Sequence, residues 1–201
     1  MSVRSPYNGG ITREQFLFYE MRTTAKLLSE GLSDEEIMEN VANENLFQFP
    51  TERMIKNITR VCLRRLHAFG DETMVNAIAN QPFDVSKQLC LYAMMKDNLL
   101  VWDFMVTVIG EKYRSLDMSF SKSEVNSFLR RLQEQDDKAA TWSEETIKKI
   151  RSVLTSILVE NDYLANARSD TLNPVLIEPI LEDYIRENNE LPALRAFNCL
   201  N

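Results

Sequence analysis

The fold is decided by one stretch of the chain, residues 51–70, whose sequence is TERMIKNITRVCLRRLHAFG. On a helical wheel, with about 100° between successive residues, the apolar side chains of this stretch gather on one face. These residues are Met54, Ile55, Ile58, Val61, Cys62, Leu66 and Phe69. Thr51 stands in front of them as a typical N-cap residue. The stretch therefore predicts an amphipathic helix over residues 51–69 whose apolar face packs into a core.

The opposite face of this helix is basic. It carries Arg53, Lys56, Asn57, Arg60 and Arg64, with His67 at one edge. After Glu52 the helix has no acidic residue, so cations lie one turn apart, and each such pair costs about 0.2–0.5 kcal/mol. One interpretation is a solvated face that pairs with acidic residues elsewhere in the fold. The other is a row of phosphate contacts about 17 Å long, with Asn57 available to a base edge. Arg65 lies at the edge of the apolar face, where we expect a snorkelling or ion-pair role rather than contact with a ligand.

Capping signals and apolar spacing extend the helical prediction in both directions. Thr12 with Gln15, and Ser33 with Glu36, have the spacing of a capping box, and Gly31 suits the end of a helix. Helical spacing in the first of these segments is kept by Phe16, Tyr19, Thr23, Leu27 and Leu28. The predicted helices are residues 12–30, 33–43, 51–69, 72–80, 84–96, 98–113, 122–135, 143–160, 178–188 and 192–199.

The composition favours an all-α fold, because five glycines and six prolines are few for the turns of a β-sandwich or barrel. We predict a helical bundle in two parts. Residues 11–70 form a helix-turn-helix-like subdomain of three helices, and residues 71–201 form a C-terminal helical bundle. A short β-hairpin near residues 163–177 is an alternative that would make residues 121–178 resemble a winged helix. Asn173-Pro174 argues against a regular second strand in that hairpin.

A second basic cluster lies in the C-terminal part. It consists of Arg130, Arg131, Lys148, Lys149 and Arg151. Acidic residues are interleaved here, so an ordinary solvated surface is the favoured interpretation. The net charge of −7 falls entirely on residues 71–201, because basic and acidic side chains balance over residues 1–70. Strong non-specific binding of nucleic acid is therefore not expected.

Residue counts exclude several kinds of active site. His67 is the only histidine, and Cys62, Cys90 and Cys199 are too widely spaced for a zinc site. The glycines have no phosphate-loop spacing. We expect no catalytic residues, no metal and no cofactor, and we do not expect an enzyme. The most apolar run, residues 99–109, is shorter than the roughly 20 residues that cross a bilayer, so we expect a cytoplasmic protein without a membrane partner.

Several segments resemble the BrxA family, small proteins encoded in BREX (bacteriophage exclusion) defence systems. They are Gly10 to Thr12, Phe18 to Arg22, Leu27 to Gly31, Asn43 to Gln48 and Arg60 to Leu66. The resemblance implies a helical fold related to the transcription antitermination protein NusB. It also implies an accessory role that involves nucleic acid, and no catalytic residues.

Together these observations lead to one functional hypothesis and two alternatives. The hypothesis is double-stranded DNA binding within a phage-defence complex, in which Arg53, Lys56, Arg60 and Arg64 neutralise phosphates and Asn57 contacts a base. The first alternative is a protein–protein adaptor whose basic helix docks on an acidic surface of another BREX protein. The second is RNA binding, which the likeness to NusB suggests.

Overall fold

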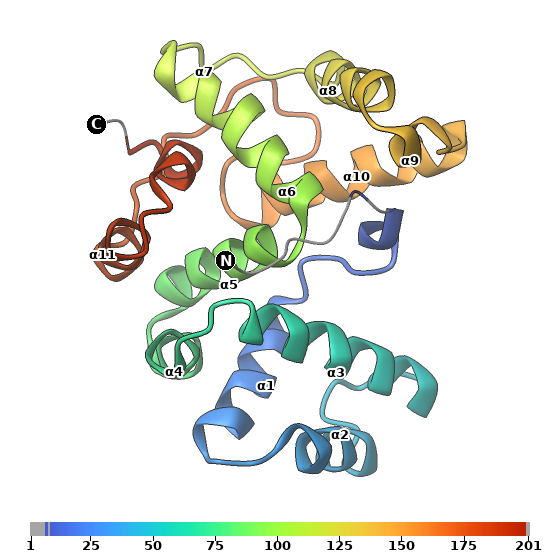
Figure 1. Ribbon diagram of the computed structural model, residues 1–201, viewed down its shortest axis with the longest axis vertical. Helices are drawn as coiled ribbons and strands as arrows, with labels where there is room; N and C mark the ends of the chain where they lie inside the picture. The colour runs from blue at the N-terminus through green and yellow to red at the C-terminus, as the bar shows by residue number, and fades with distance from the viewer. Residues whose placement is uncertain (1–6, 8, 200–201) are drawn as a thin grey trace. The chain divides into compact units, whose positions relative to one another are not determined.

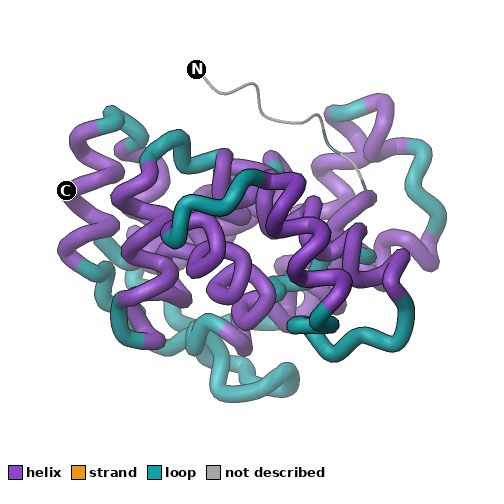
Figure 2. The backbone as a smooth tube through the Cα atoms, turned by 90° about the horizontal axis from the view of Figure 1, so that it is seen from below, coloured by secondary structure: helices purple, strands orange, loops and turns teal. Residues whose placement is uncertain are grey.

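The computed structural model describes residue 7 and residues 9–199, and it confirms an all-α fold (Figure 1). Figure 2 colours the described backbone as helix and loop only. The α-helices are α1 (Phe18–Ser29), α2 (Asp34–Asn43), α3 (Glu52–His67), α4 (Glu72–Asn80), α5 (Phe83–Asp97), α6 (Leu99–Phe104), α7 (Gly110–Arg114), α8 (Lys122–Gln135), α9 (Asp137–Ala140), α10 (Glu144–Glu160) and α11 (Pro179–Glu187). Two 3-10 helices, η1 (Gly9–Thr12) and η3 (Leu191–Phe197), and one π-helical turn, η2 (Met105–Ile109), complete them. No helix in the described part of the chain is long and apolar enough to cross a membrane.

The chain divides into two compact units. The first is Phe16–Asp97, and the second combines residues 9–15 with residues 98–199. In the first unit α1 lies against α3 and α4, and α5 packs on both α3 and α4 (Figure 1). The first unit therefore continues to Asp97, whereas the sequence led us to expect a boundary after Gly70. The reason is that the apolar sides of α4 and α5 are needed to cover α1 and α3.

Short-range capping interactions explain where helices begin and end in the first unit. The Ser33 N–H donates to Glu36 Oε2 at 2.8 Å and the Glu36 N–H donates back to Ser33 Oγ, so the predicted capping box of α2 is confirmed. Gly31 has a φ of 88°, a left-handed conformation that favours glycine between α1 and α2. Ile37 and Val41 of α2 form a core with Ile55 and Leu63 of α3, and Leu27 and Leu28 of α1 pack against it.

The second unit is built around α10 and the continuous segment α6–η2–α7. The predicted apolar stripe of α10 is buried, with Ile150, Leu154 and Leu158 fully inaccessible to solvent. In η2 the Gly110 N–H bonds to the carbonyl of Met105, five residues back, so one extra residue is absorbed in a π-helical turn. This segment packs against η3 and α8.

One expectation from the sequence was wrong, and one alternative is not realised. Thr12 does not begin a helix: its hydroxyl donates to the carbonyl of Gly9 at 2.8 Å within η1, and α1 begins only at Phe18. The β-hairpin near residues 163–177 does not form either, so residues 121–178 have no wing. Among the described residues of this region the one β-bridge is isolated and joins Ser119 to Thr171, and within the segment the Asn173 N–H donates to the Tyr163 carbonyl at 2.9 Å. Tyr163, Leu164 and Leu172 are buried in the core of their unit, which fixes the segment as an irregular loop.

Candidate nucleic-acid interface

Helix α3 has the two faces that its sequence predicts. Thr51 caps its first turn by accepting a hydrogen bond from the Met54 N–H. Its apolar residues are buried, except that Met54 keeps 42% of its surface exposed near the N-terminal end. Because this apolar face is anchored in the core, the basic face is held at a fixed orientation toward solvent.

The basic face is open but its charges are not equivalent. Arg53, Asn57, Arg60 and Arg64 are exposed and Lys56 is half-buried. Among the described residues, neither Arg53 nor Arg60 forms an ion pair with a carboxylate. Arg60 Nη1 instead donates to Asn57 Oδ1 at 3.1 Å. Lys56 Nζ lies 2.5 Å from Glu52 Oε1 one turn earlier, and this hydrogen bond lowers the pKa of Glu52. Two uncompensated guanidinium groups therefore flank Asn57.

Arg64 and Arg65 share one carboxylate, that of Asp97 at the end of α5. Arg64 Nε and Nη2 donate to the two carboxylate oxygens of Asp97 at 2.7 and 2.8 Å. Arg65 is only 1% exposed, and its Nη1 donates to the carbonyl of Phe16 at 3.0 Å. Arg65 Nε lies 4.0 Å from Asp97 Oδ2. The expected ion-pair role of Arg65 is confirmed, whereas Arg64 already has an anionic partner within its own unit.

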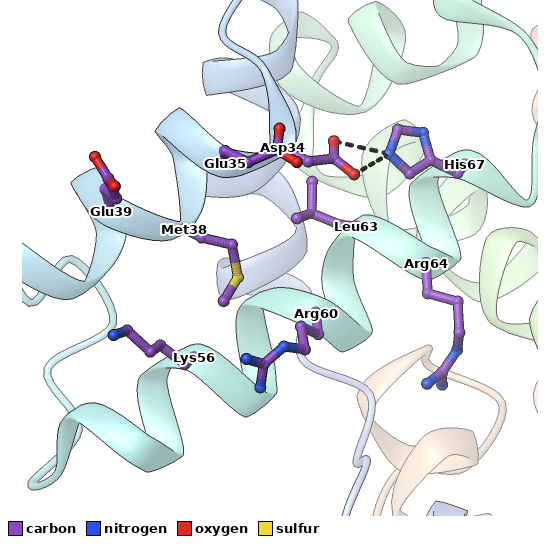
Figure 3. Close-up of a pocket in the computed structure, with 9 residues that line it drawn as sticks. All are labelled: Asp34, Glu35, Met38, Glu39, Lys56, Arg60, Leu63, Arg64 and His67. Atoms are coloured by element: carbon purple, nitrogen blue, oxygen red, sulfur yellow. Dashed lines mark hydrogen bonds and ion pairs between the residues drawn. The ribbon is translucent and has the colours of Figure 1, made fainter.

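An acidic wall faces part of the basic helix. Asp34, Glu35 and Glu39 of α2 line a groove of about 590 Å³ together with cations of α3, as Figure 3 shows. The groove also contains Met38 and Leu63, and the remaining residues are Lys56, Arg60, Arg64 and His67. His67 Nε2 lies 3.0 Å from both carboxylate oxygens of Asp34. The wheel of α3 gave no sign of this wall, although the spacing of the acids on α2 marks a single charged side of that helix.

The outer side of α3 has a different character. There Glu52, Arg53, Lys56, Asn57 and Arg60 line a shallow hollow of about 400 Å³. Of these five side chains only Glu52 is acidic, and it forms an ion pair with Lys56. The described lining of this hollow includes no residue of α2, in contrast to the groove described above.

Members of the second basic cluster line two different hollows. Arg131 of α8 lines a hollow with Lys112 and Glu124, whereas Lys148 and Arg151 of α10 line another with Trp142 and Glu144. Two of its members are also engaged. Lys149 pairs with Glu145 at 2.9 Å, and Arg151 donates to Asn126 Oδ1 at 2.9 Å. Arg130 is exposed on α8. This division agrees with the interpretation of the cluster as ordinary surface.

No group of His, Cys, Asp and Glu side chains in the described residues has the arrangement of a metal site. Burial raises the pKa of the Cys62 thiol to about 12, so this cysteine is a packing residue. Cys90 is fully buried as well.

Comparisons with known proteins agree on one family. The BrxA family model matches residues 5–189. The chain is 32% identical over 164 residues, 82% of each protein, to the BREX protein BrxA of Bacillus cereus. It is 25% identical over 177 residues, 88% of each protein, to the BREX protein BrxA of Paramagnetospirillum magneticum. The crystal structure of an uncharacterized protein from Magnetospirillum magneticum has the same fold, with a TM-score of 0.81 over 96% of this chain and 98% of that one at 22% identity.

Proposed function

Since the chain belongs to the BrxA family and is a component of phage defence, we propose that it is a non-catalytic accessory protein that binds double-stranded DNA through α3. The observation that carries this proposal is the pair of exposed guanidinium groups, Arg53 and Arg60, that have no carboxylate partner in the described chain. Uncompensated arginines on a rigid helix are suited to contact with phosphate oxygens.

Each residue of the basic face has a distinct role in this proposal. Arg53, Lys56 and Arg60 neutralise successive phosphates from the outer side of α3. The bond between Lys56 and Glu52 joins two exposed side chains and is screened by solvent, so a phosphate displaces it at little cost. The oxygen of the Asn57 amide accepts from Arg60, which leaves its NH2 group to donate to a base-edge acceptor such as a purine N7. Arg64 contributes less, because Asp97 already compensates its charge.

The test is fluorescence anisotropy of a labelled DNA duplex across a salt series, with RNA as competitor. Three to four phosphate contacts predict a log–log slope between about −2.7 and −3.6. The variant with Arg53, Lys56, Arg60 and Arg64 all replaced by Ala should lose binding while its circular dichroism stays helical. Arg60→Ala alone should weaken binding more than Arg64→Ala.

A matched control comes from the second basic cluster. Replacing Arg130, Arg131, Lys148 and Lys149 by Ala removes the same number of charges from the other unit. This control should retain most of the affinity. Equal loss in both four-charge variants would mean that only the net charge matters, and unchanged affinity in the α3 variant would refute the assignment.

A protein–protein adaptor is the second candidate, and the two-sided groove favours it. Glu35 and Glu39 stand opposite Lys56 and Arg60, a pattern suited to a partner that carries both signs of charge, such as another BREX protein. Under this alternative the protein co-purifies with that partner, the pairing is lost in Glu35→Lys/Glu39→Lys as well as in the α3 variant, and the duplex shows no affinity. Preference for RNA in the competition would instead support the second alternative, RNA binding.

A further inference from the structure

Two aromatic rings of the first unit stand open to solvent. Tyr19 of α1 is 71% exposed and Phe83, the first residue of α5, is 52% exposed, with their ring centroids 6.4 Å apart. Phe18 is buried beneath them, its centroid 5.3 Å from that of Tyr19 and 5.5 Å from that of Phe83. Phe18 thus supports both rings from the core, and the two exposed rings form a contiguous aromatic surface because their centroids are 6.4 Å apart.

A cation lies over one of these rings. The Arg22 guanidinium lies 4.7 Å from the centroid of the Phe83 ring. It is fixed there by hydrogen bonds from Nη2 to the Gln81 carbonyl at 2.9 Å and from Nη1 to Ser86 Oγ at 3.3 Å. In the described residues its charge has no carboxylate partner. Lys26 is exposed one turn further along α1, on the same side as Tyr19 and Arg22.

This combination selects one class of ligand. An apolar protein surface would leave the positive charge of Arg22 buried and uncompensated, at a large cost. An unpaired nucleobase, in contrast, stacks on an aromatic ring or on a guanidinium plane, while the phosphate that follows it pairs with a neighbouring cation. Bases inside a duplex are stacked on each other, so their faces are not available to these rings.

We propose that Tyr19, Phe83, Arg22 and Lys26 form a stacking site for unpaired bases of single-stranded nucleic acid, separate from the duplex-binding face of α3. Every base has an aromatic face, so the site binds without strong sequence preference. Arg22 keeps Phe83 in place, and Lys26 contacts the backbone. This inference goes beyond the duplex binding proposed above and does not depend on it.

The first experiment is anisotropy at low salt with short oligothymidylate and oligouridylate strands, which distinguishes DNA from RNA as the source of the bases. Tyr19→Leu/Phe83→Leu keeps the apolar volume and removes both rings. We expect it to lose at least about tenfold in affinity, which is typical for the loss of a stacking ring. Leu116→Ala/Leu176→Ala, which removes two exposed apolar side chains of the other unit, is the matched control and should bind as the wild type does.

The second experiment locates the contact directly. An oligonucleotide that contains iododeoxyuridine is irradiated with the wild-type protein, and the cross-linked peptide is identified by mass spectrometry. Cross-links at Tyr19 or Phe83 are expected, and they should persist in the four-charge variant of α3. Absence of single-strand binding, full affinity in the variant without the rings, or cross-links confined to α3 would each overturn this proposal without affecting the test of duplex binding.

Discussion

Replacing Asp97 with Asn removes a negative charge that lies beside two arginines. The Asp97 side chain is only 6% exposed, and it accepts two hydrogen bonds from Arg64. Arg65 Nε lies 4.0 Å from the same carboxylate. The substitution therefore affects one cation that water can reach and one that it cannot.

The expected loss of stability comes from the buried cation. Arg64 is solvent-accessible, so its share of the interaction is worth about 0–1 kcal/mol. Arg65 is buried, and removal of the negative charge beside a buried cation costs up to about 3–5 kcal/mol. Because Asn keeps one oxygen acceptor, we expect Asp97→Asn to lower the free energy of unfolding by about 3 kcal/mol. In a chain of this size that corresponds to a fall in Tm of about 6–12 °C.

The assay is urea denaturation followed by circular dichroism. Arg64→Ala is the control and should cost less than about 1 kcal/mol. The double variant Asp97→Asn/Arg65→Met should recover part of the stability, because the uncompensated charge is removed along with its partner. If Asp97→Asn costs no more than Arg64→Ala, then Arg65 does not need this carboxylate and the explanation is wrong.

Two further predictions concern the second unit. A Cβ on Gly110 would lie 2.8 Å from the Cβ of Arg195, so Gly110→Ala should displace η3 and lower the free energy of unfolding by about 1–3 kcal/mol. A thermal melt measures this loss, and an unchanged Tm would show that η3 can move away without loss of stability. The hydrogen bond from Lys112 lowers the pKa of Asp117 to about 2, so its stabilising effect is complete above the unfolded value of 3.8 and is lost as the pH falls toward 2. The difference in urea midpoint between wild type and Asp117→Asn should therefore shrink between about pH 4 and pH 2, and a difference that does not change with pH would contradict this account.

The sequence predicted those helices whose causes are local. Ser33 and Glu36 form their capping box within a single turn, and the apolar stripe of α10 lies within one helix. Thr12 and Gln15 have the same spacing in the sequence, but no helix begins at Thr12. Ile11 is fully buried next to α10 in the second unit, and the burial of Phe16 belongs to the first. The chain between them therefore cannot continue as one helix.

The same distinction between local and long-range causes applies to the candidate site. The open face of α3 could be derived from the spacing of its arginines, because one helix determines it. The compensation of Arg64 by Asp97 could not, since the two residues are 33 positions apart and meet only through the packing of α5 on α3. Tyr19 kept the spacing of a core residue in the sequence and is instead among the most exposed aromatic side chains. Its exposure depends on where α5 begins beside α1, which periodicity does not encode.

The π-helical turn η2 makes the segment α6–η2–α7 unusually tolerant of the deletion of one residue. In a regular α-helix, deletion of one residue rotates everything that follows by about 100° and turns packed side chains away from their partners. Between Met105 and Ile109 one residue is already surplus to the helical phase. Losing it would return the segment to an unbroken α-helix and leave Gly110 still directed at Arg195. Length variation that would disrupt any other helix of this unit can therefore be absorbed at this one turn.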